Sequence, residues 1–202
     1  ATPQHYAYMK ISEGCNRTCT FCAIPLMRGN HVSRTIESLV EEARLLVSRG
    51  VKEIMLIAQE LTYYGLDIYK KRALPELLHK LADIPGLEWI RLHYAYPSKF
   101  PMEIIEVMKE RDNICKNLDM PLQHASNNML AAMKRQITRE EMEALIHEIR
   151  LRIPEICLRT TLIAGFPGET REDVEELKDF LERMRFDRVG IFTYSHEEQT
   201  GA

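Results

Sequence analysis

Residues 13–22 read Glu-Gly-Cys-Asn-Arg-Thr-Cys-Thr-Phe-Cys, a C-x3-C-x2-C spacing directly after a strand-like segment. Cys15, Cys19 and Cys22 offer three thiolates from one short loop. Iron–sulfur clusters are held by Cys thiolates, so three ligands on a four-iron cubane leave one iron free to bind a small molecule. Tetrahedral zinc needs a fourth residue close by, and His31 fits no such pair. The spacing therefore favours a [4Fe-4S] cluster, with zinc or incidental buried thiols as alternatives.

Apolar runs alternate with amphipathic stretches along the rest of the chain. The predicted strands are Ala7–Ser12, Glu53–Ala58, Glu88–Ala95, Lys116–Met120, Ile156–Ala164 and Asp187–Tyr194. The predicted helices are Thr35–Arg49, Leu74–Ala82, Pro101–Arg111, Ser126–Lys134, Thr138–Arg152 and Thr170–Met184. Strand–helix alternation predicts an α/β fold with a parallel sheet built from right-handed crossovers. About six units are too few for a closed eight-stranded barrel.

Polar and glycine-rich segments follow the predicted strands. They are the cysteine loop, Gln59-Glu60, His93–Tyr96, Gln123-His124 and Gly165–Glu169. In parallel α/β barrels the chemistry lies at the carboxyl ends of the strands. These segments therefore predict one site at that edge of the sheet.

Bulk composition narrows the class of protein. The chain has 202 residues, 45% of them hydrophobic, which is enough for one sizeable core. Its formal net charge is −3, without a basic block for gripping a phosphate backbone. No apolar run is long enough to span a bilayer, and the first residues do not resemble a signal peptide.

Cys115 and Cys157, set among apolar neighbours, are expected to be small buried residues. The cysteine usage fits a reducing, cytoplasmic setting.

Several short motifs carry a family resemblance. The C-x3-C-x-Phe-C pattern resembles the signature of radical S-adenosylmethionine (SAM) enzymes, and further segments resemble their methylthiotransferase branch: Ile11–Asn16, Met27–Gly29, Val32–Arg34, Gln59–Asp67 and His93–Pro97. The resemblance covers nearly the whole chain. It implies the partial (β/α)6, TIM-like barrel of that superfamily. It also implies a cluster whose open iron binds SAM, which is cleaved to a 5′-deoxyadenosyl radical.

Within this branch, the last two segments are more similar to members that modify a ribosomal protein than to members that modify tRNA. The implied activity adds a methylthio group to the β-carbon of an aspartate in the small-subunit ribosomal protein S-twelve. The alternatives are methylthiolation of a tRNA adenosine and, from another class, a non-catalytic zinc or thiol redox module. The resemblance also implies an electron donor such as flavodoxin or ferredoxin.

The resemblance assigns SAM contacts to several positions, while no catalytic residue is assigned. Phe21 precedes the last cysteine of the motif, and Gln59 stands where the superfamily has a Gly-Gly-Glu segment that holds the SAM amino group. Gln123 stands where related enzymes contact the ribose, with a hydrogen bond to its own loop as the alternative. Backbone at Ile163 and Gly165 is expected to meet the adenine.

Two arginines are candidates for the SAM carboxylate. Arg135 and Arg159 each carry a guanidinium fork that matches a carboxylate, although a surface ion pair is the commoner role of a lone arginine. Side chains that are candidates for the substrate side are His93, Tyr94, Tyr96 and His124.

The family architecture implies parts beyond this sequence. Residues 1–202 correspond to the radical SAM core domain. An N-terminal methylthiotransferase domain carrying a second [4Fe-4S] cluster and a C-terminal β domain are expected only in the full-length protein. The core alone is therefore expected to bind one cluster and SAM without completing methylthiolation.

Overall fold

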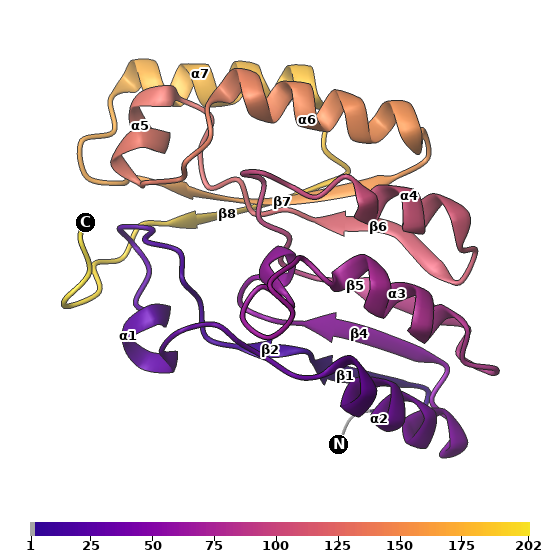
Figure 1. Cartoon of the computed structure of the whole chain (residues 1–202). Coiled ribbons are helices and arrows are strands. Elements are labelled where there is room, and N and C mark those ends of the chain that lie inside the picture. Colours follow the sequence, from indigo (N-terminus) through magenta and orange to yellow (C-terminus); the bar gives the residue numbers. More distant parts are fainter. Residues whose placement is uncertain (1–2) are drawn as a thin grey trace.

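A single parallel sheet organises the chain, and the computed structural model describes residues 3–202. Its six strands are joined in sequential order and every neighbouring pair is parallel. They are β1 (Tyr6–Lys10), β4 (Glu53–Ile57), β5 (Trp89–Leu92), β6 (Ile114–Asp119), β7 (Cys157–Ala164) and β8 (Arg188–Thr193). All their arrowheads point to the side of the molecule where α1 and the C-terminal end lie (Figure 1).

Helices connect these strands. The crossover helices are α2 (Ile36–Ser48), α3 (Leu74–Ala82), α4 (Glu103–Glu110), α6 (Arg139–Arg152) and α7 (Arg171–Met184). Threonine side chains cap three of them, and both α6 and α7 begin with a reciprocal capping box, which satisfies the free amides of the first turn. Smaller elements are α1 (Ile24–Arg28), η1 (Leu61–Tyr63), α5 (Asn127–Ala132) and the antiparallel ribbon of β2 (Ser12–Glu13) with β3 (Val32–Ser33).

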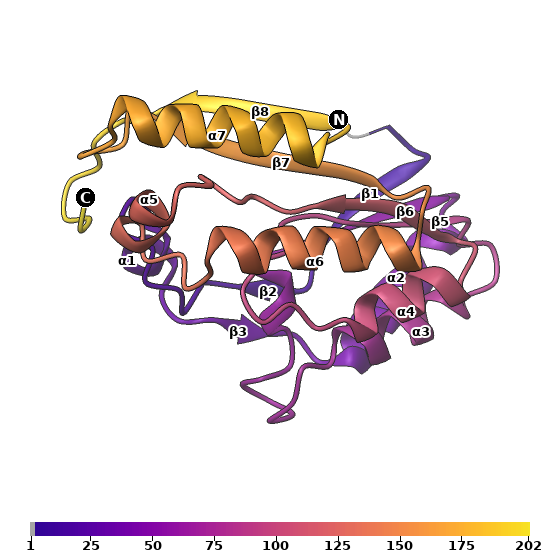
Figure 2. The same ribbon diagram turned by 90° about the horizontal axis from the view of Figure 1, so that it is seen from above.

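The two faces of the sheet differ because successive strand residues point to opposite sides. Even-numbered residues such as Ile54, Leu56 and Ile90 are completely buried in the main core. Odd-numbered residues on the same strands, such as Arg91, are only half-buried. Seen from above, α6 lies along the sheet and α7 lies close to β7 and β8 (Figure 2). On β4 to β7 the open inner face is therefore lined by the odd-numbered, more polar residues, and on β8 the register places even-numbered residues such as Arg188 on that face.

The predicted partial (β/α)6 barrel agrees with this α/β architecture in strand number, direction and order. Element ends differ by a few residues. The third strand ends at Leu92 instead of Ala95, and the fourth begins at Ile114 instead of Lys116. Sequence analysis missed the short elements α1, β2, β3 and η1, since segments of two to five residues carry too little periodicity. Among residues 3–202, no helix is long and apolar enough to cross a membrane.

One expectation about the core is wrong. Cys115 and Cys157 are half-buried rather than buried. Both occupy odd positions on β6 and β7, on the inner face that the crossover helices do not cover. Their apolar sequence neighbours, such as Ile114 and Leu158, face the opposite side and are buried there.

Candidate active site at the carboxyl edge of the sheet

The cysteine loop is held at its base by the β2–β3 ribbon. Cys15 donates its backbone N–H to the Gly29 carbonyl oxygen at 3.1 Å, which joins the two sides of the excursion. Gly14 has a φ of +77°, and a Cβ there would lie 2.2 Å from the Asn30 carbonyl oxygen. Only glycine fits such an approach. The loop is also tied to α5, because the Thr20 hydroxyl donates to the Ala132 carbonyl oxygen at 2.9 Å.

All three motif cysteines line one cavity of about 310 Å³ at the carboxyl ends of the strands. The other lining residues come from the segments after four strands of the sheet and from the inner face of the last two strands: Arg17, Phe21, Gln59, Glu60, Tyr94, Ala95, Tyr96, Pro121, Gln123, Arg135, Arg159, Thr161 and Phe192. The structure thus brings together eight of the ten residues predicted for cofactor and metal binding. It does so although they are spread from position 15 to position 159.

A buried ion pair anchors the middle of the cysteine loop. The guanidinium of Arg17 donates from Nη2 and Nε to Glu60 Oε2, at 2.7 and 3.0 Å. It also lies between the rings of Tyr63 and Tyr96, with its central carbon 4.1 and 3.7 Å from their centroids. The second oxygen of Glu60 accepts from the Thr62 N–H and hydroxyl at 2.8 and 2.7 Å. Sequence analysis missed this pair, whose only signal was an arginine inside the motif and an acid after the second strand.

Arg135 approaches the cysteines from the other side. Its Nη1 lies 3.3 Å from Cys19 Sγ, and its guanidinium carbon lies 4.2 Å from the centroid of the Tyr96 ring. The Tyr96 hydroxyl donates to the Arg135 backbone carbonyl oxygen at 2.7 Å, which holds the Tyr96 ring against this segment. Arg135 is only 4% exposed. It is therefore not the surface ion-pairing residue that a lone arginine commonly is.

The three motif sulfurs line one cavity, where each thiolate can bind a different iron of a cluster. Burial raises the pKa of the Cys15 and Cys22 thiols, so they favour the protonated form until a metal ion replaces the proton. Among the described residues, no group of three His, Cys, Asp or Glu side chains is arranged to hold a single ion. A cubane makes no such demand, because each thiolate binds a different iron. The donor set therefore fits a cluster.

The two glutamines in the cavity carry unused hydrogen-bonding capacity. Gln59 Nε2 donates to Glu13 Oε1 at 3.1 Å, but its Oε1 is buried without a partner among residues 3–202. Gln123 Oε1 is also buried without a described partner, and the residue has a φ of +77°. A buried carbonyl oxygen without a partner is costly, so each oxygen is suited to accept from a bound ligand. Phe21 contributes an apolar wall and packs against the cluster of Met129, Met133 and Phe166.

Other predicted residues lie outside this cavity. Ile163 packs in a small apolar cluster beside Phe21, and Gly165 donates its N–H to Glu169 Oε2 at 2.8 Å. Neither residue lines the cavity, and their proposed role at the adenine stays a prediction. His124 is completely buried. Its Nδ1 accepts from the Ser126 N–H at 3.0 Å, and its Nε2 lies 3.1 Å from Glu169 Oε1. It is a local hydrogen-bond partner.

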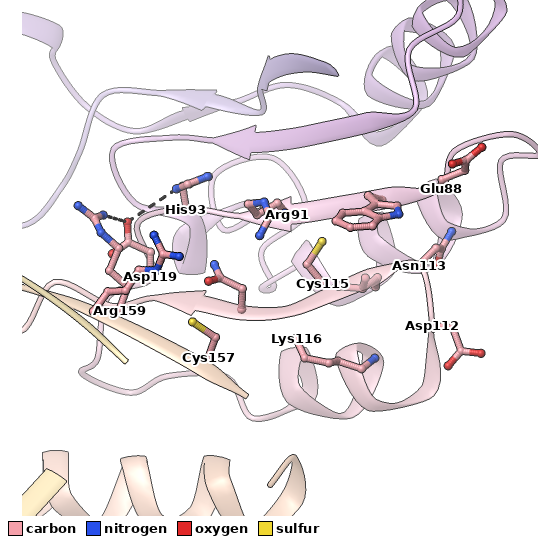
Figure 3. Close-up of a pocket in the computed structure, with 14 residues that line it drawn as sticks. Glu88, Arg91, His93, Asp112, Asn113, Cys115, Lys116, Asp119, Cys157 and Arg159 are labelled. Atoms are coloured by element: carbon pink, nitrogen blue, oxygen red, sulfur yellow. Dashed lines mark hydrogen bonds and ion pairs between the residues drawn. The ribbon is translucent and has the colours of Figure 1, made fainter. Parts of the chain in front are cut away.

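A second, larger pocket of about 600 Å³ continues along the inner face of β5 to β8. Figure 3 shows His93, Asp119 and Arg159 gathered at one end, with Cys115 and Cys157 farther along the strands. Arg159 Nη1 donates to Asp119 Oδ2 at 2.7 Å, and His93 Nδ1 lies 3.7 Å from the same oxygen. Arg159 lines both pockets, so the two adjoin at this residue.

Fold and site together define an open parallel α/β protein with a cysteine-lined cavity at the carboxyl edge of its sheet. The radical SAM superfamily model matches residues 9–181. The chain therefore belongs to the radical SAM superfamily.

Curated relatives are similar over the whole chain. The ribosomal protein uS12 methylthiotransferase RimO of Bacteroides fragilis is 60% identical over 201 residues, which is 100% of this chain and 46% of the relative. The protein with the same name in Flavobacterium psychrophilum is 61% identical over the same shares. The chain thus spans about half the length of the curated relatives it matches.

Solved structures agree on the fold. The radical SAM methyltransferase TsrM from Kitasatospora setae, solved with cobalamin and a [4Fe-4S] cluster, aligns with a TM-score of 0.75 at 21% identity. The alignment covers 93% of this chain and 36% of that one. Coproporphyrinogen III oxidase (HemN) from Escherichia coli, a radical SAM enzyme, aligns with a TM-score of 0.65 at 18% identity, covering 95% and 44%. At these identities the similarity concerns the fold alone.

Proposed function

We propose that this chain is the radical SAM core of a methylthiotransferase that modifies an aspartate of ribosomal protein uS12. The observation that carries the proposal is the convergence of Cys15, Cys19 and Cys22 on one cavity at the carboxyl edge of the sheet. The radical SAM family match supports the cofactors, a [4Fe-4S] cluster and SAM. The names of relatives about 60% identical over the whole chain support the substrate.

Seven residues of the cavity have a proposed task. The three cysteine thiolates hold the cluster, which supplies the electron for reductive cleavage of SAM when both are bound. Arg135 sets a positive charge beside Cys19. Gln59 and Gln123 offer their unpartnered carbonyl oxygens to N–H and O–H groups of SAM. Phe21 shields the same space from water with its ring.

The larger context is part of the proposal. Residues 1–202 are the core domain of a longer enzyme that works in the cytoplasm, and the second cluster belongs to another of its domains. A low-potential protein such as flavodoxin or ferredoxin supplies the electron. The net charge of −3 gives the core no evident means of holding tRNA by itself, which favours the protein substrate.

Anaerobic reconstitution of this chain with iron and sulfide tests the cluster. We expect a brown protein that holds about four irons per chain and binds SAM. Cys15→Ser, Cys19→Ser and Cys22→Ser variants should each lose most of the iron. The matched control replaces Cys115 and Cys157 with serine, because both lie in the other pocket, and it should keep the iron. A colourless chain, or equal iron loss in the control, contradicts the cluster assignment.

The full-length enzyme tests the substrate. Incubated with SAM and a reductant, it should add a methylthio mass to purified uS12 and leave tRNA unchanged, as mass spectrometry would detect. Modification of tRNA instead would support the alternative, an adenosine methylthiotransferase.

A further inference from the structure

Two arginines lie side by side on the open inner face of the sheet. Arg159 of β7 and Arg188 of β8 are register partners, and both line the larger pocket. Asp119 is the carboxylate that faces them, and it is committed to Arg159 at 2.7 Å. Arg188 is exposed and has no ion-pair partner among residues 3–202. Two neighbouring guanidiniums repel each other, so the pair is suited to a further negative charge.

Asp119 holds one member of this pair, Arg159, in place. Its side chain is 1% exposed, and its Oδ1 is buried without a hydrogen-bond partner among the described residues. The Arg159 side chain remains 40% exposed beyond this contact, so its other N–H groups are open to the pocket. A guanidinium held in this way loses little conformational freedom when it binds a carboxylate in a bidentate manner.

The location of Arg159 links the pair to the cysteine cavity. This residue lines both pockets, and Thr161 and Phe192 continue the inner face into the cavity. A group bound by Arg159 therefore lies at the junction of the two spaces. A substrate entering along the open face of the sheet would meet the arginine pair directly before the cavity.

We propose that Arg159 and Arg188 form a carboxylate-binding site that holds an acidic side chain of the peptide substrate at the mouth of the cysteine cavity. This inference rests on the proposed function for the identity of the peptide. The pair differs from Arg135, which lies deeper and contacts Cys19. In this proposal Arg159 binds the substrate carboxylate, whereas the sequence alone made it a candidate for binding the SAM carboxylate.

Peptide binding tests the site directly. The probe is a fluorescent peptide spanning the target aspartate of uS12, measured by anisotropy with full-length, cluster-loaded enzyme and SAM. Arg188→Gln is the informative variant, because it leaves the Arg159–Asp119 ion pair intact. We expect it to weaken peptide binding about tenfold or more, as loss of a charge-assisted hydrogen bond would. A peptide with asparagine in place of the aspartate should bind equally to both proteins. Arg44→Gln on the exposed side of α2 is the matched control.

SAM affinity and iron content separate the possible failures. We expect both to be unchanged in Arg188→Gln and in Arg159→Gln. Unchanged binding of the acidic peptide by Arg188→Gln overturns the carboxylate site, even if uS12 is methylthiolated. If Arg159→Gln binds SAM more weakly but binds the peptide normally, the carboxylate site is also overturned, and Arg159 instead contacts SAM. If the wild-type enzyme modifies tRNA and not uS12, the proposed function fails together with the choice of peptide.

Discussion

Replacing Glu60 with glutamine should destabilise the chain strongly, although the two side chains have nearly the same shape. The Glu60 side chain is 1% exposed and that of Arg17 is 6% exposed, so the guanidinium cannot turn to bulk water. Glutamine offers one oxygen where glutamate offers two. Its NH2 group must then face either the Arg17 guanidinium or the Thr62 donors, which both need an acceptor.

The magnitude follows from this burial. Removing one partner of a buried pair typically costs about 3–5 kcal/mol, because it leaves an uncompensated charge. The rings of Tyr63 and Tyr96 lie on either side of Arg17 in both proteins, so their cation–π contacts keep the guanidinium in place without offsetting the lost ion pair. We therefore expect Glu60→Gln to lower the free energy of unfolding by about 3 kcal/mol.

Urea unfolding of the reduced, metal-free chain measures this change. Glu175→Gln is the matched control, since Glu175 forms a 2.7 Å ion pair with Lys178 while both side chains are about 60% exposed. Its cost should stay under about 1 kcal/mol. Adding Arg17→Met to Glu60→Gln removes the stranded charge and should restore part of the loss. A Glu60→Gln cost as small as that of the control, with an unchanged m-value, would refute the reasoning.

Three further changes test local contacts by the same unfolding measurement. Tyr96→Phe removes the hydroxyl that donates to the Arg135 carbonyl oxygen and should cost about 1–2 kcal/mol, whereas a neutral result would contradict that hydrogen bond. Burial lowers the pKa of His124 below 6.5 despite the hydrogen bond to Glu169, so the folded state resists protonation. Stability should fall as the pH drops below about 6.5, and His124→Gln should flatten this slope. Burial alone would raise the pKa of Asp173, but hydrogen bonds lower it to about 2. Asp173 should contribute about 2 kcal/mol to the free energy of unfolding above about pH 4, and this contribution should be lost towards pH 2. Asp173→Asn should abolish this part of the pH dependence of stability.

Features that depend on local pattern could be predicted from the sequence. The strand β4 is largely apolar, buried residues alternate along β7, and the three cysteines carry their own spacing. Placement at the carboxyl edge followed from parallel strand order, since that order brings the ends of all strands to one side. Gln59 and Gln123 could thus be assigned to one site before their distances were known.

Features that depend on contacts between distant segments could not be predicted. Arg17 and Glu60 are 43 positions apart, and neither motif indicates that they pair. The apolar sequence neighbours of Cys115 and Cys157 predict a core position for both residues. Their true environment depends on which face of the sheet the helices cover. Arg159 was a candidate for the SAM carboxylate, but only the strand register with Arg188 indicated a second cation beside it.

The charges around the cysteine cavity explain why its residues suit a negatively charged centre. Arg17 is neutralised by Glu60, so it contributes rigidity more than net charge. Arg135 has no carboxylate partner among the described residues; its neighbours are Cys19 Sγ, the Tyr96 ring and the Pro121 carbonyl oxygen. A buried cation without a counter-charge is unfavourable in the empty cavity and favourable once thiolates form. Metal binding replaces the thiol protons that burial retains on Cys15 and Cys22, and the charge of Arg135 is then balanced. The same guanidinium that costs stability in the metal-free chain therefore stabilises the loaded one.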